Sequence, residues 1–354
     1  QRRTSASDQI PRARREQRNV RRGTRHHAID GKPEGDSTHD RAIHYNKMKR
    51  VIGVTIAIAA AIAAAAFGYQ LKYKTPPNPS QVLPLTKGEL EGVSPIPINA
   101  DQFIDPSIFQ TSKTSYVENL NGSPIAGVVN HHVLASDLLA RFFSTLRAAR
   151  PNLRRIIIIS PDHFKSGDST ISIGRESYSS FGKNTMTDET SIESLITLGV
   201  AVTGSRQLFE REHGIGALVP FIAETFPDIK IVPIAIRADV NRSDAEKLGR
   251  ALKSFMNDKT FVLISSDMSH YLYEEDAFAH DRDTLSWLKT LDANNFRKAT
   301  DDNTDSGPSF VALSALFDEI GLKQNFHELD HSISSRYGGS RENTTTYITG
   351  FWVN

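Results

Sequence analysis

A run of four isoleucines within residues 155–160 places the tightest constraint on how this chain can fold. Successive side chains of a β-strand point to opposite faces of the sheet, so an unbroken β-branched run indicates a strand buried on both faces. Such a strand needs helices packed above and below its sheet. Residues 260–265 form a second run of this kind.

Apolar segments with helical spacing alternate with the strand-like ones. The expected strands are 125–130, 155–160, 230–236, 260–265 and 345–352. The expected helices with apolar spacing are 135–150, 214–225, 243–256, 278–291 and 309–320. A further helix through about 198 is expected because Thr190 and Glu193 form a capping box at its start. This alternation predicts an α/β fold with a mostly parallel central sheet and helices on both faces. Ligands of such folds bind at the carboxyl ends of the strands.

The pattern divides the chain into four parts. Residues 1–47 read as a disordered basic tail, 48–71 as a transmembrane helix or signal anchor, and 72–100 as a proline-rich linker. Residues 101–354 read as the globular α/β domain. Within positions 1–50, fourteen Lys or Arg residues stand against six Asp or Glu residues. This excess favours either a flank that orients the next helix or attraction to an anionic membrane surface or nucleic acid.

Residues 51–71 contain no charged side chain and are long enough to span the ~30 Å apolar layer of a membrane. Lys47, Lys49 and Arg50 precede them, which predicts a cytoplasmic N-terminus and an extracytoplasmic C-terminal domain. A cleaved signal peptide, followed by secretion, and a buried helix are the alternatives.

Composition excludes several kinds of site. The chain has no cysteine, so disulfides, zinc–thiolate sites and a cysteine nucleophile are ruled out. Its net charge of +1 gives no reason to expect a nucleic-acid partner.

Four segments combine a short apolar strand or turn with polar residues that include His or Asp. They are residues 128–132, 159–163, 211–216 and 265–270, which carry His131, His163, His213 and the pair Asp267 and His270. Three of them follow expected strands, and the segment 211–216 opens an expected helix. Because parallel strands end at one edge of a sheet, we expect these side chains to converge there.

Imidazole is a good ligand for iron, copper or zinc, and a histidine near neutral pH can move a proton. The convergence therefore predicts a metal or acid–base site, while the alternative for any one histidine is a structural hydrogen bond. His132 follows His131 directly and, on a continuing strand, would point to the opposite face. We interpret it as structural.

These segments resemble the Memo family, whose bacterial and archaeal members are called AmmeMemoRadiSam system protein B. The matching stretches are Asn130-His131-His132-Val133-Leu134-Ala135, Ser160-Pro161-Asp162-His163-Phe164, Glu212-His213-Gly214-Ile215-Gly216 and Ser265-Ser266-Asp267-Met268-Ser269-His270-Tyr271. The resemblance spans roughly residues 90–354. It implies a fold similar to the catalytic subunit of class III extradiol dioxygenases, which bind non-haem Fe(II) through two His and one Glu.

By this resemblance His131 and His163 match the metal-binding histidines, and His213 matches the acid–base position. Asp267 and His270 match a segment near the pocket. The cofactor implied is a transition metal such as Fe, Cu or Zn. The family name further implies a radical-SAM protein and an AMMECR-type protein as partners, by association only.

The third metal ligand departs from the family pattern. Ser306, within Thr304-Asp305-Ser306-Gly307, stands where relatives have Glu or Cys. A neutral hydroxyl is a poorer ligand than a carboxylate or thiolate, and Asp305 is expected to point elsewhere. The departure argues against ring cleavage.

Three functions follow. The leading hypothesis is a membrane-anchored, Memo-like protein with a histidine-lined, metal-binding pocket for a small ligand, related to oxidoreductases of the dioxygenase type. The second is a binding or scaffold module that kept the fold and lost a metal ligand. The third is a metal-dependent hydrolase that uses the same histidines and Asp267.

Overall fold

The computed structural model describes residues 96–113 and 116–354. The predicted tail 1–47, the predicted span within 48–71 and most of the linker 72–100 lie outside these residues. The folded part begins before the predicted boundary at 101, because Ile98–Asn99 already forms a strand of the sheet.

The localisation prediction needs a correction. In the part of the chain that the structure describes, no helix has the length and apolar character needed to cross a membrane. Among the described residues, therefore, no helix supports the predicted single-pass topology with its cytoplasmic N-terminus. The segment 51–71, on which that prediction rested, lies outside the described residues.

The strands lie in one sheet across the described residues. Their bounds are β1 (Ile98–Asn99), β2 (Pro124–Val129), β3 (Arg155–Pro161), β4 (Ile171–Ile173), β5 (Tyr178–Ser180), β6 (Lys183–Thr187), β7 (Val202–Thr203), β8 (Lys230–Ile236), β9 (Thr260–Ser265), β10 (His270–Leu272), β11 (Phe326–Ile333) and β12 (Thr344–Val353). Their order is β1-β5-β6-β8-β3-β9-β2-β12-β10, with β11 on β12 and with β4 on β7 and β8.

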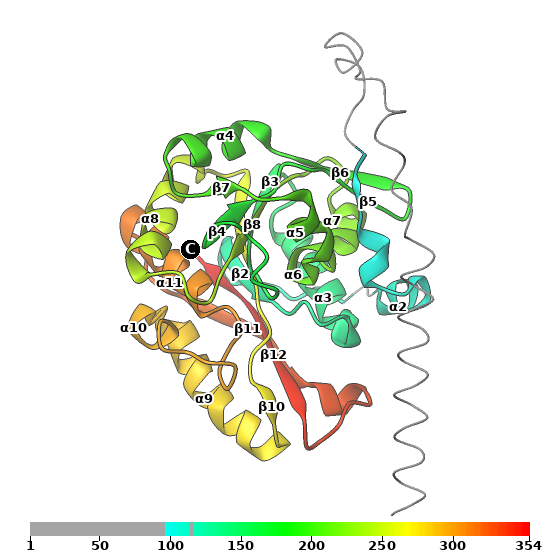
Figure 1. The fold of residues 1–354 in the computed structure, drawn as a ribbon. Helices are drawn as coiled ribbons and strands as arrows, with labels where there is room; N and C mark the ends of the chain where they lie inside the picture. The colour runs from blue at the N-terminus through cyan, green and yellow to red at the C-terminus, as the bar shows by residue number, and fades with distance from the viewer. Residues whose placement is uncertain (1–95, 114–115) are drawn as a thin grey trace, which may run out of the picture. The chain divides into compact units, whose positions relative to one another are not determined.

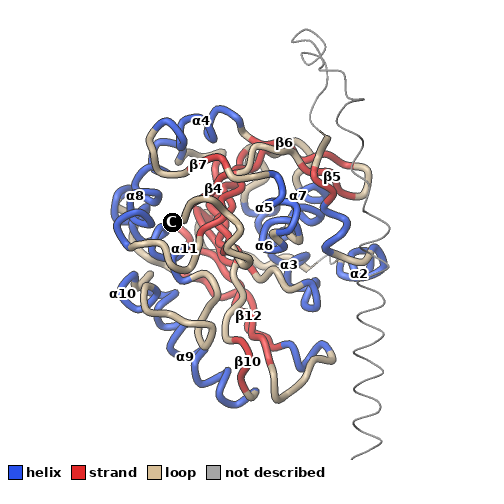
Figure 2. The backbone as a smooth tube through the Cα atoms, viewed as in Figure 1, coloured by secondary structure: helices blue, strands red, loops and turns tan. Residues whose placement is uncertain are grey.

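The centre of the sheet is parallel, as the sequence predicts. Strands β6, β8, β3, β9 and β2 run parallel to their neighbours in this order, and β12 is antiparallel to β2. Figure 2 shows these strands passing through the middle of the domain with helices on both sides.

The helices are mostly short. Their bounds are α2 (Pro106–Ser112), α3 (Ser136–Ala149), α4 (Glu189–Thr197), α5 (Arg206–Arg211), α6 (His213–Gly216), α7 (Val219–Thr225), α8 (Arg242–Leu252), α9 (Glu274–Thr290), α10 (Ala293–Phe296) and α11 (Gly307–Ile320). Single 3-10 turns are η2 (Ala100–Phe103), η3 (Val133–Ala135), η4 (Lys253–Phe255) and η5 (Ser334–Tyr337).

The isoleucines of β3 show how the two faces are filled. Ile156 and Ile158 belong to one apolar core, together with side chains of α3 and α7. Ile157 and Ile159 belong to the other, with side chains of α8 and α11. All four are fully buried, so alternate residues of one strand hold both helix layers on the sheet. Figure 1 shows α3 and α7 on one side of the central strands and α8 and α11 on the other.

Two helix expectations were wrong in detail. Helix α4 is capped by Asp188, whose side chain accepts a hydrogen bond from the Ser191 amide, and not by the predicted Thr190 capping box. The expected helix 214–225 is divided into α6 and α7. Pro220 lies in the first turn of α7, where its missing amide proton is tolerated.

The register of the sheet explains why distant residues meet. Val129 at the end of β2 lies opposite Ser265 at the end of β9, and Ile264 lies opposite Ile159 in β3. These three parallel strands therefore end at the same edge. The chain that leaves each of them carries one of the predicted polar segments.

Candidate metal centre

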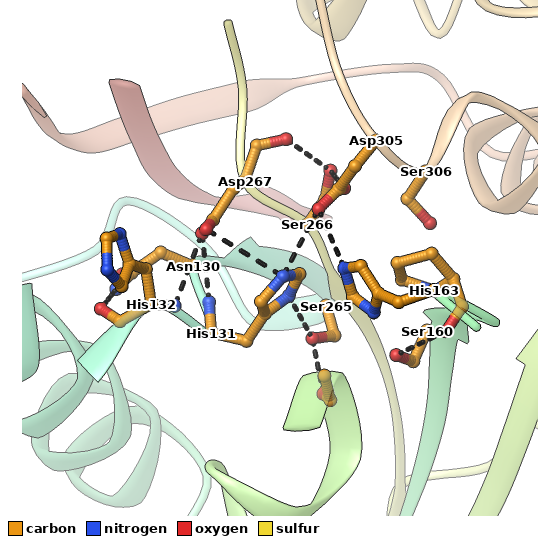
Figure 3. A network of polar contacts seen from close by, with 12 residues as sticks. Asn130, His131, His132, Ser160, His163, Ser265, Ser266, Asp267, Asp305 and Ser306 are labelled. Atoms are coloured by element: carbon orange, nitrogen blue, oxygen red, sulfur yellow. Dashed lines mark hydrogen bonds and ion pairs between the residues drawn. The ribbon is translucent and has the colours of Figure 1, made fainter. Parts of the chain in front are cut away.

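His131 is held at the edge of the sheet by contacts from two sides. It is buried, and its backbone amide donates to Asp267 Oδ1 at 3.1 Å. Its ring Nδ1 lies 3.0 Å from Ser265 Oγ, and its Nε2 lies 3.2 Å from Asp305 Oδ2 (Figure 3). The ring is thus anchored through one nitrogen and presents the other to Asp305.

His163, which follows β3, is anchored in the same way. Its Nδ1 lies 2.6 Å from Glu212 Oε1, and its backbone amide donates to Glu212 Oε2 at 3.0 Å. Glu212 is fully buried and also accepts the amide of Gly214 at 2.8 Å, as the cap of α6. His163 Nε2 lies 3.4 Å from Asp305 Oδ2. One carboxylate oxygen thus faces two imidazoles.

His213, the first residue of α6, completes the group. Its ring centroid lies 4.0 Å from that of His163 and 5.1 Å from that of His131. One ligand atom from each of the three rings lies within 4.8 Å of the others, as a shared metal ion requires. His213 is the least constrained, because its Nδ1 is 3.9 Å from Glu212 Oε1 and its side chain is 40% exposed.

A second group of possible ligands shares His131. Suitable atoms of His131, Asp267 and Asp305 also lie within 4.8 Å of one another. The Oδ2 atom of Asp305 is buried and has no hydrogen-bond partner. A buried carboxylate oxygen without a hydrogen bond is costly unless a charged group faces it.

The pKa values of the three histidines differ because their neighbours differ. Burial alone would lower the pKa of His163, but the neighbouring carboxylates of Asp305 and Glu212 raise it to about 10. Burial lowers the pKa of His213 to about 4, and the positive charge of its two histidine neighbours acts in the same direction. The centre therefore holds one imidazole that keeps its proton and one that is neutral at pH 7.

His131 and Asp305 shift each other's pKa through their opposite charges. Burial alone would lower the pKa of His131, but the carboxylates of Asp267 and Asp305 outweigh burial and raise it. Burial would raise the pKa of Asp305, yet His131 and His163 hold it well below its usual range. Asp305 is therefore an anion in the centre.

A cavity of about 330 Å³ opens beside these residues. It is lined by Phe103, His131, His132, Val133, His163, His213, Ala217, Asp267, His270, Tyr271 and Thr345. The Nδ1 atom of His270 is buried and has no hydrogen-bond partner. Tyr271 has a φ of 60°, an uncommon conformation for a residue other than glycine.

A larger cavity, of about 730 Å³, is lined by other residues and differs in its chemistry. Its two cationic side chains already have partners: Lys253 pairs with Glu319 at 3.0 Å, and Arg150 donates to the backbone carbonyls of Asp258 and Pro124. No histidine lines it. Chemistry, not size, therefore selects the smaller cavity as the candidate site.

The structure brings five of the six predicted site residues to one place. His131, His163 and His213 face one another, and Asp267 and His270 line the same cavity. Ser306, predicted as a metal ligand, has its buried hydroxyl 2.5 Å from Ser309 Oγ.

Asp305 faces His131 and His163, so the expectation that it points elsewhere was wrong. It lies in the turn before α11, so no strand or helix periodicity applies to its side chain. Its amide donates to the Asp267 carbonyl at 3.4 Å, and its Oδ1 accepts from Ser266 Oγ at 3.0 Å. These bonds hold the turn against the end of β9.

The condition under which His132 was expected to point to the opposite face is not met. The strand does not continue through it, since β2 ends at Val129 and His132 precedes the turn η3. Its ring lines the cavity, with Nδ1 at 2.8 Å from the hydroxyl of Tyr347. Glu212 and Ser265 received no separate role from the sequence, although both lie within the quoted segments.

The chain is similar to several known proteins. A MEMO1 family protein of Pyrobaculum aerophilum is 25% identical over 247 residues, which covers 67% of this chain and 86% of that protein. One from Pyrobaculum arsenaticum is 26% identical with the same coverage. The crystal structure of an uncharacterized protein from Escherichia coli K12 aligns with a TM-score of 0.44 and 11% identity, covering 63% of this chain and 98% of that one.

The family assignment follows from a longer match. The model of the Memo-like protein family matches residues 123–351, which include every residue of the centre and nearly all of the sheet. Since this match covers more than half of the chain, the chain belongs to the Memo family.

Proposed function

We propose that this protein binds a divalent transition metal through His131, His163 and Asp305, with His213 beside them, and that the adjoining cavity takes a small ligand. One observation carries the proposal. The buried Oδ2 of Asp305 has no hydrogen-bond partner, yet it faces the Nε2 atoms of two imidazoles.

The residues fit such a metal in their chemistry. Two histidines and one carboxylate are a ligand set used by non-haem iron, and imidazole also suits zinc and copper. Metal-binding histidines usually donate their second N–H to a carboxylate or another acceptor, which fixes the ring. Glu212 and Ser265 are the partners of the second nitrogen here. A bound metal would supply Lewis-acid or redox chemistry to the ligand.

The rest of the cavity can bind and orient that ligand. His270 Nδ1 is buried without a partner, so a polar group of the ligand can bond to it. His213 is the neutral and more exposed imidazole, able to accept a proton from the ligand. A volume of about 330 Å³ suits a small molecule.

The direct test is metal content and affinity. Full-length protein is stripped with a chelator and titrated with Fe(II), Zn(II) and Cu(II) by calorimetry, with elemental analysis of the protein as purified. We expect one ion per chain and a loss of at least about 100-fold in affinity in His163→Ala. His327→Ala, in β11 and outside both groups of possible ligands, is the matched control. Wild-type protein that takes up none of these ions would refute the proposal.

The identity of the metal separates the two catalytic alternatives. Preference for Fe(II) with oxygen uptake on a panel of catechols favours the dioxygenase-like reaction, and preference for Zn(II) with turnover of esters or amides favours the hydrolase. The scaffold alternative rested on the serine at 306. The Asp305 carboxylate in the centre removes that reason.

A further inference from the structure

The hydroxyl of Ser265 links two parts of the centre. It is fully buried at the end of β9, lies 2.5 Å from the carbonyl oxygen of Gly214, and lies 3.0 Å from His131 Nδ1. A carbonyl can only accept, so the single hydroxyl proton goes to Gly214. Ser265 must then accept from His131, which places a proton on Nδ1. In a neutral ring this leaves the lone pair on Nε2, the atom that faces Asp305.

The next residue, Ser266, makes a corresponding contact with Asp305. Ser266 Oγ lies 3.0 Å from Asp305 Oδ1, 3.0 Å from the uncharged carbonyl oxygen of Asp267, and 2.6 Å from Thr304 Oγ1. A carboxylate only accepts, and a charged acceptor forms the stronger bond, so the hydroxyl donates to Asp305. This bond occupies Oδ1 and leaves Oδ2 directed at the two imidazoles.

We infer that Ser265 and Ser266 are positioning residues of the centre: Ser265 aims His131 Nε2, and Ser266 aims Asp305 Oδ2, at one point. Ser265 ends β9 and Ser266 follows it, so one dipeptide contacts an imidazole and a carboxylate from separate parts of the chain. This inference rests on the proposed metal function and adds residues to it that are not themselves ligands.

A buried serine elsewhere at the same edge shows what a merely structural hydroxyl looks like. Ser160, at the end of β3, is fully buried, and its hydroxyl donates only to the carbonyl of the next residue, Pro161. It contacts no candidate ligand by hydrogen bond. Ser160→Ala is therefore a matched control for loss of a buried hydroxyl in this region.

The first experiment reads the His131 ring in the full-length, metal-free protein. Whether the ring is neutral or cationic, a bond to Ser265 keeps a proton on Nδ1. We expect a slowly exchanging Nδ1–H signal for His131 in nitrogen-15 spectra of the wild type and of Ser160→Ala, and its loss in Ser265→Ala. An unprotonated Nδ1 in the wild type would overturn the inference.

The second experiment measures Zn(II) affinity by calorimetry, with thermal unfolding as the check on folding. We expect the dissociation constant to rise roughly 10–100-fold in Ser265→Ala and in Ser266→Ala, the usual range for partners of metal ligands. Ser265→Thr, which keeps the hydroxyl, is expected to bind closer to wild type than Ser265→Ala, and Ser160→Ala to bind like wild type.

The two failures are distinguishable. Wild-type protein without metal affinity overturns the proposed function, and this inference falls with it. Wild-type protein that binds Zn(II) while Ser265→Ala and Ser266→Ala bind it as tightly as Ser160→Ala overturns only the positioning role.

Discussion

Within residues 96–113 and 116–354, the protein buries contacts between histidine and carboxylate in two places, and the two clusters contain similar groups. In the second cluster, Asp281 of α9 is fully buried and pairs with His331 of β11, with 2.6 Å between Oδ2 and Nε2. Its Oδ1 accepts from Ser269 Oγ at 2.8 Å and from Thr346 Oγ1 at 2.7 Å. Every carboxylate oxygen there has its donors.

The candidate metal centre differs, because one of its carboxylate oxygens has no hydrogen-bond partner. Asp305 Oδ2 has no hydrogen-bond partner, and three imidazoles turn ligand atoms toward one another instead of toward separate acceptors. The second nitrogens of His131 and His163 are nevertheless anchored. A cavity opens beside this centre.

The comparison teaches that a buried histidine–carboxylate contact does not by itself mark a site. Buried polar groups are expected to satisfy one another, and the Asp281 cluster does so in full. In the candidate centre, the Nδ1 atoms of His131 and His163 are hydrogen-bonded, while their Nε2 atoms converge on an Asp305 oxygen that has no hydrogen bond. This arrangement suits the binding of a ligand and not only the stability of the fold. We therefore expect substitutions in the Asp281 cluster to change stability and those in the centre to change metal binding.

The largest effect is expected in the Asp281 cluster. Asp281→Ala removes the acceptor of His331, Ser269 and Thr346 at once, so the free energy of unfolding should fall by about 3–4 kcal/mol. Chemical denaturation of the full chain measures it. Metal affinity of the folded fraction should stay within about twofold of wild type, and a loss as large as in His163→Ala would erase the distinction between the two clusters.

Asp305→Asn tests the opposite side of the comparison. The substitution keeps the size of the side chain and removes its charge, so Zn(II) affinity should fall by about 100-fold, or about 2.7 kcal/mol. The free energy of unfolding of the metal-free protein should change less than in Asp281→Ala. Unchanged affinity would mean that Asp305 is not the anionic ligand.

The pH dependence of metal binding sharpens the same contrast. The pKa of His163 is raised to about 10, so this ring is protonated at neutral pH before metal binds and must release its proton. Affinity should therefore rise with pH, by about tenfold per unit for this proton between pH 6 and 8. Calorimetry in buffers of different ionisation enthalpy counts the released protons. A flat profile would show that His163 is not a ligand.

The sequence predicted the parts of the fold that periodicity controls. Strands β8 and β9 have the predicted bounds, and the isoleucines of β3 fill both faces as their unbroken run required. Short pieces such as β4, β5 and β7 carry too few residues for any period to appear. They were not predicted.

The candidate site divides in the same manner. His131 and His163 follow predicted strands, so their convergence could be predicted from the ends of a parallel sheet. Asp305 and Ser306 lie in a turn, where the direction of a side chain depends on bonds to residues distant in sequence. No local pattern distinguishes which of the two neighbours enters the centre.

The smallest effect is expected for Ser306, the residue that the sequence alone predicted as a metal ligand. Ser306→Ala removes a hydroxyl that contacts Ser309 and no histidine, so stability should fall by about 1 kcal/mol while Zn(II) affinity stays within about threefold of wild type. Alanine is the informative substitution, because a glutamate would bury an unpaired charge beside α11. Measured together with Asp305→Asn, the Ser306→Ala variant shows which of these two adjacent residues binds the metal. If Ser306→Ala loses metal and Asp305→Asn keeps it, the turn before α11 presents its residues to the centre in the opposite sense, and the hydroxyl, not the carboxylate, is the third ligand.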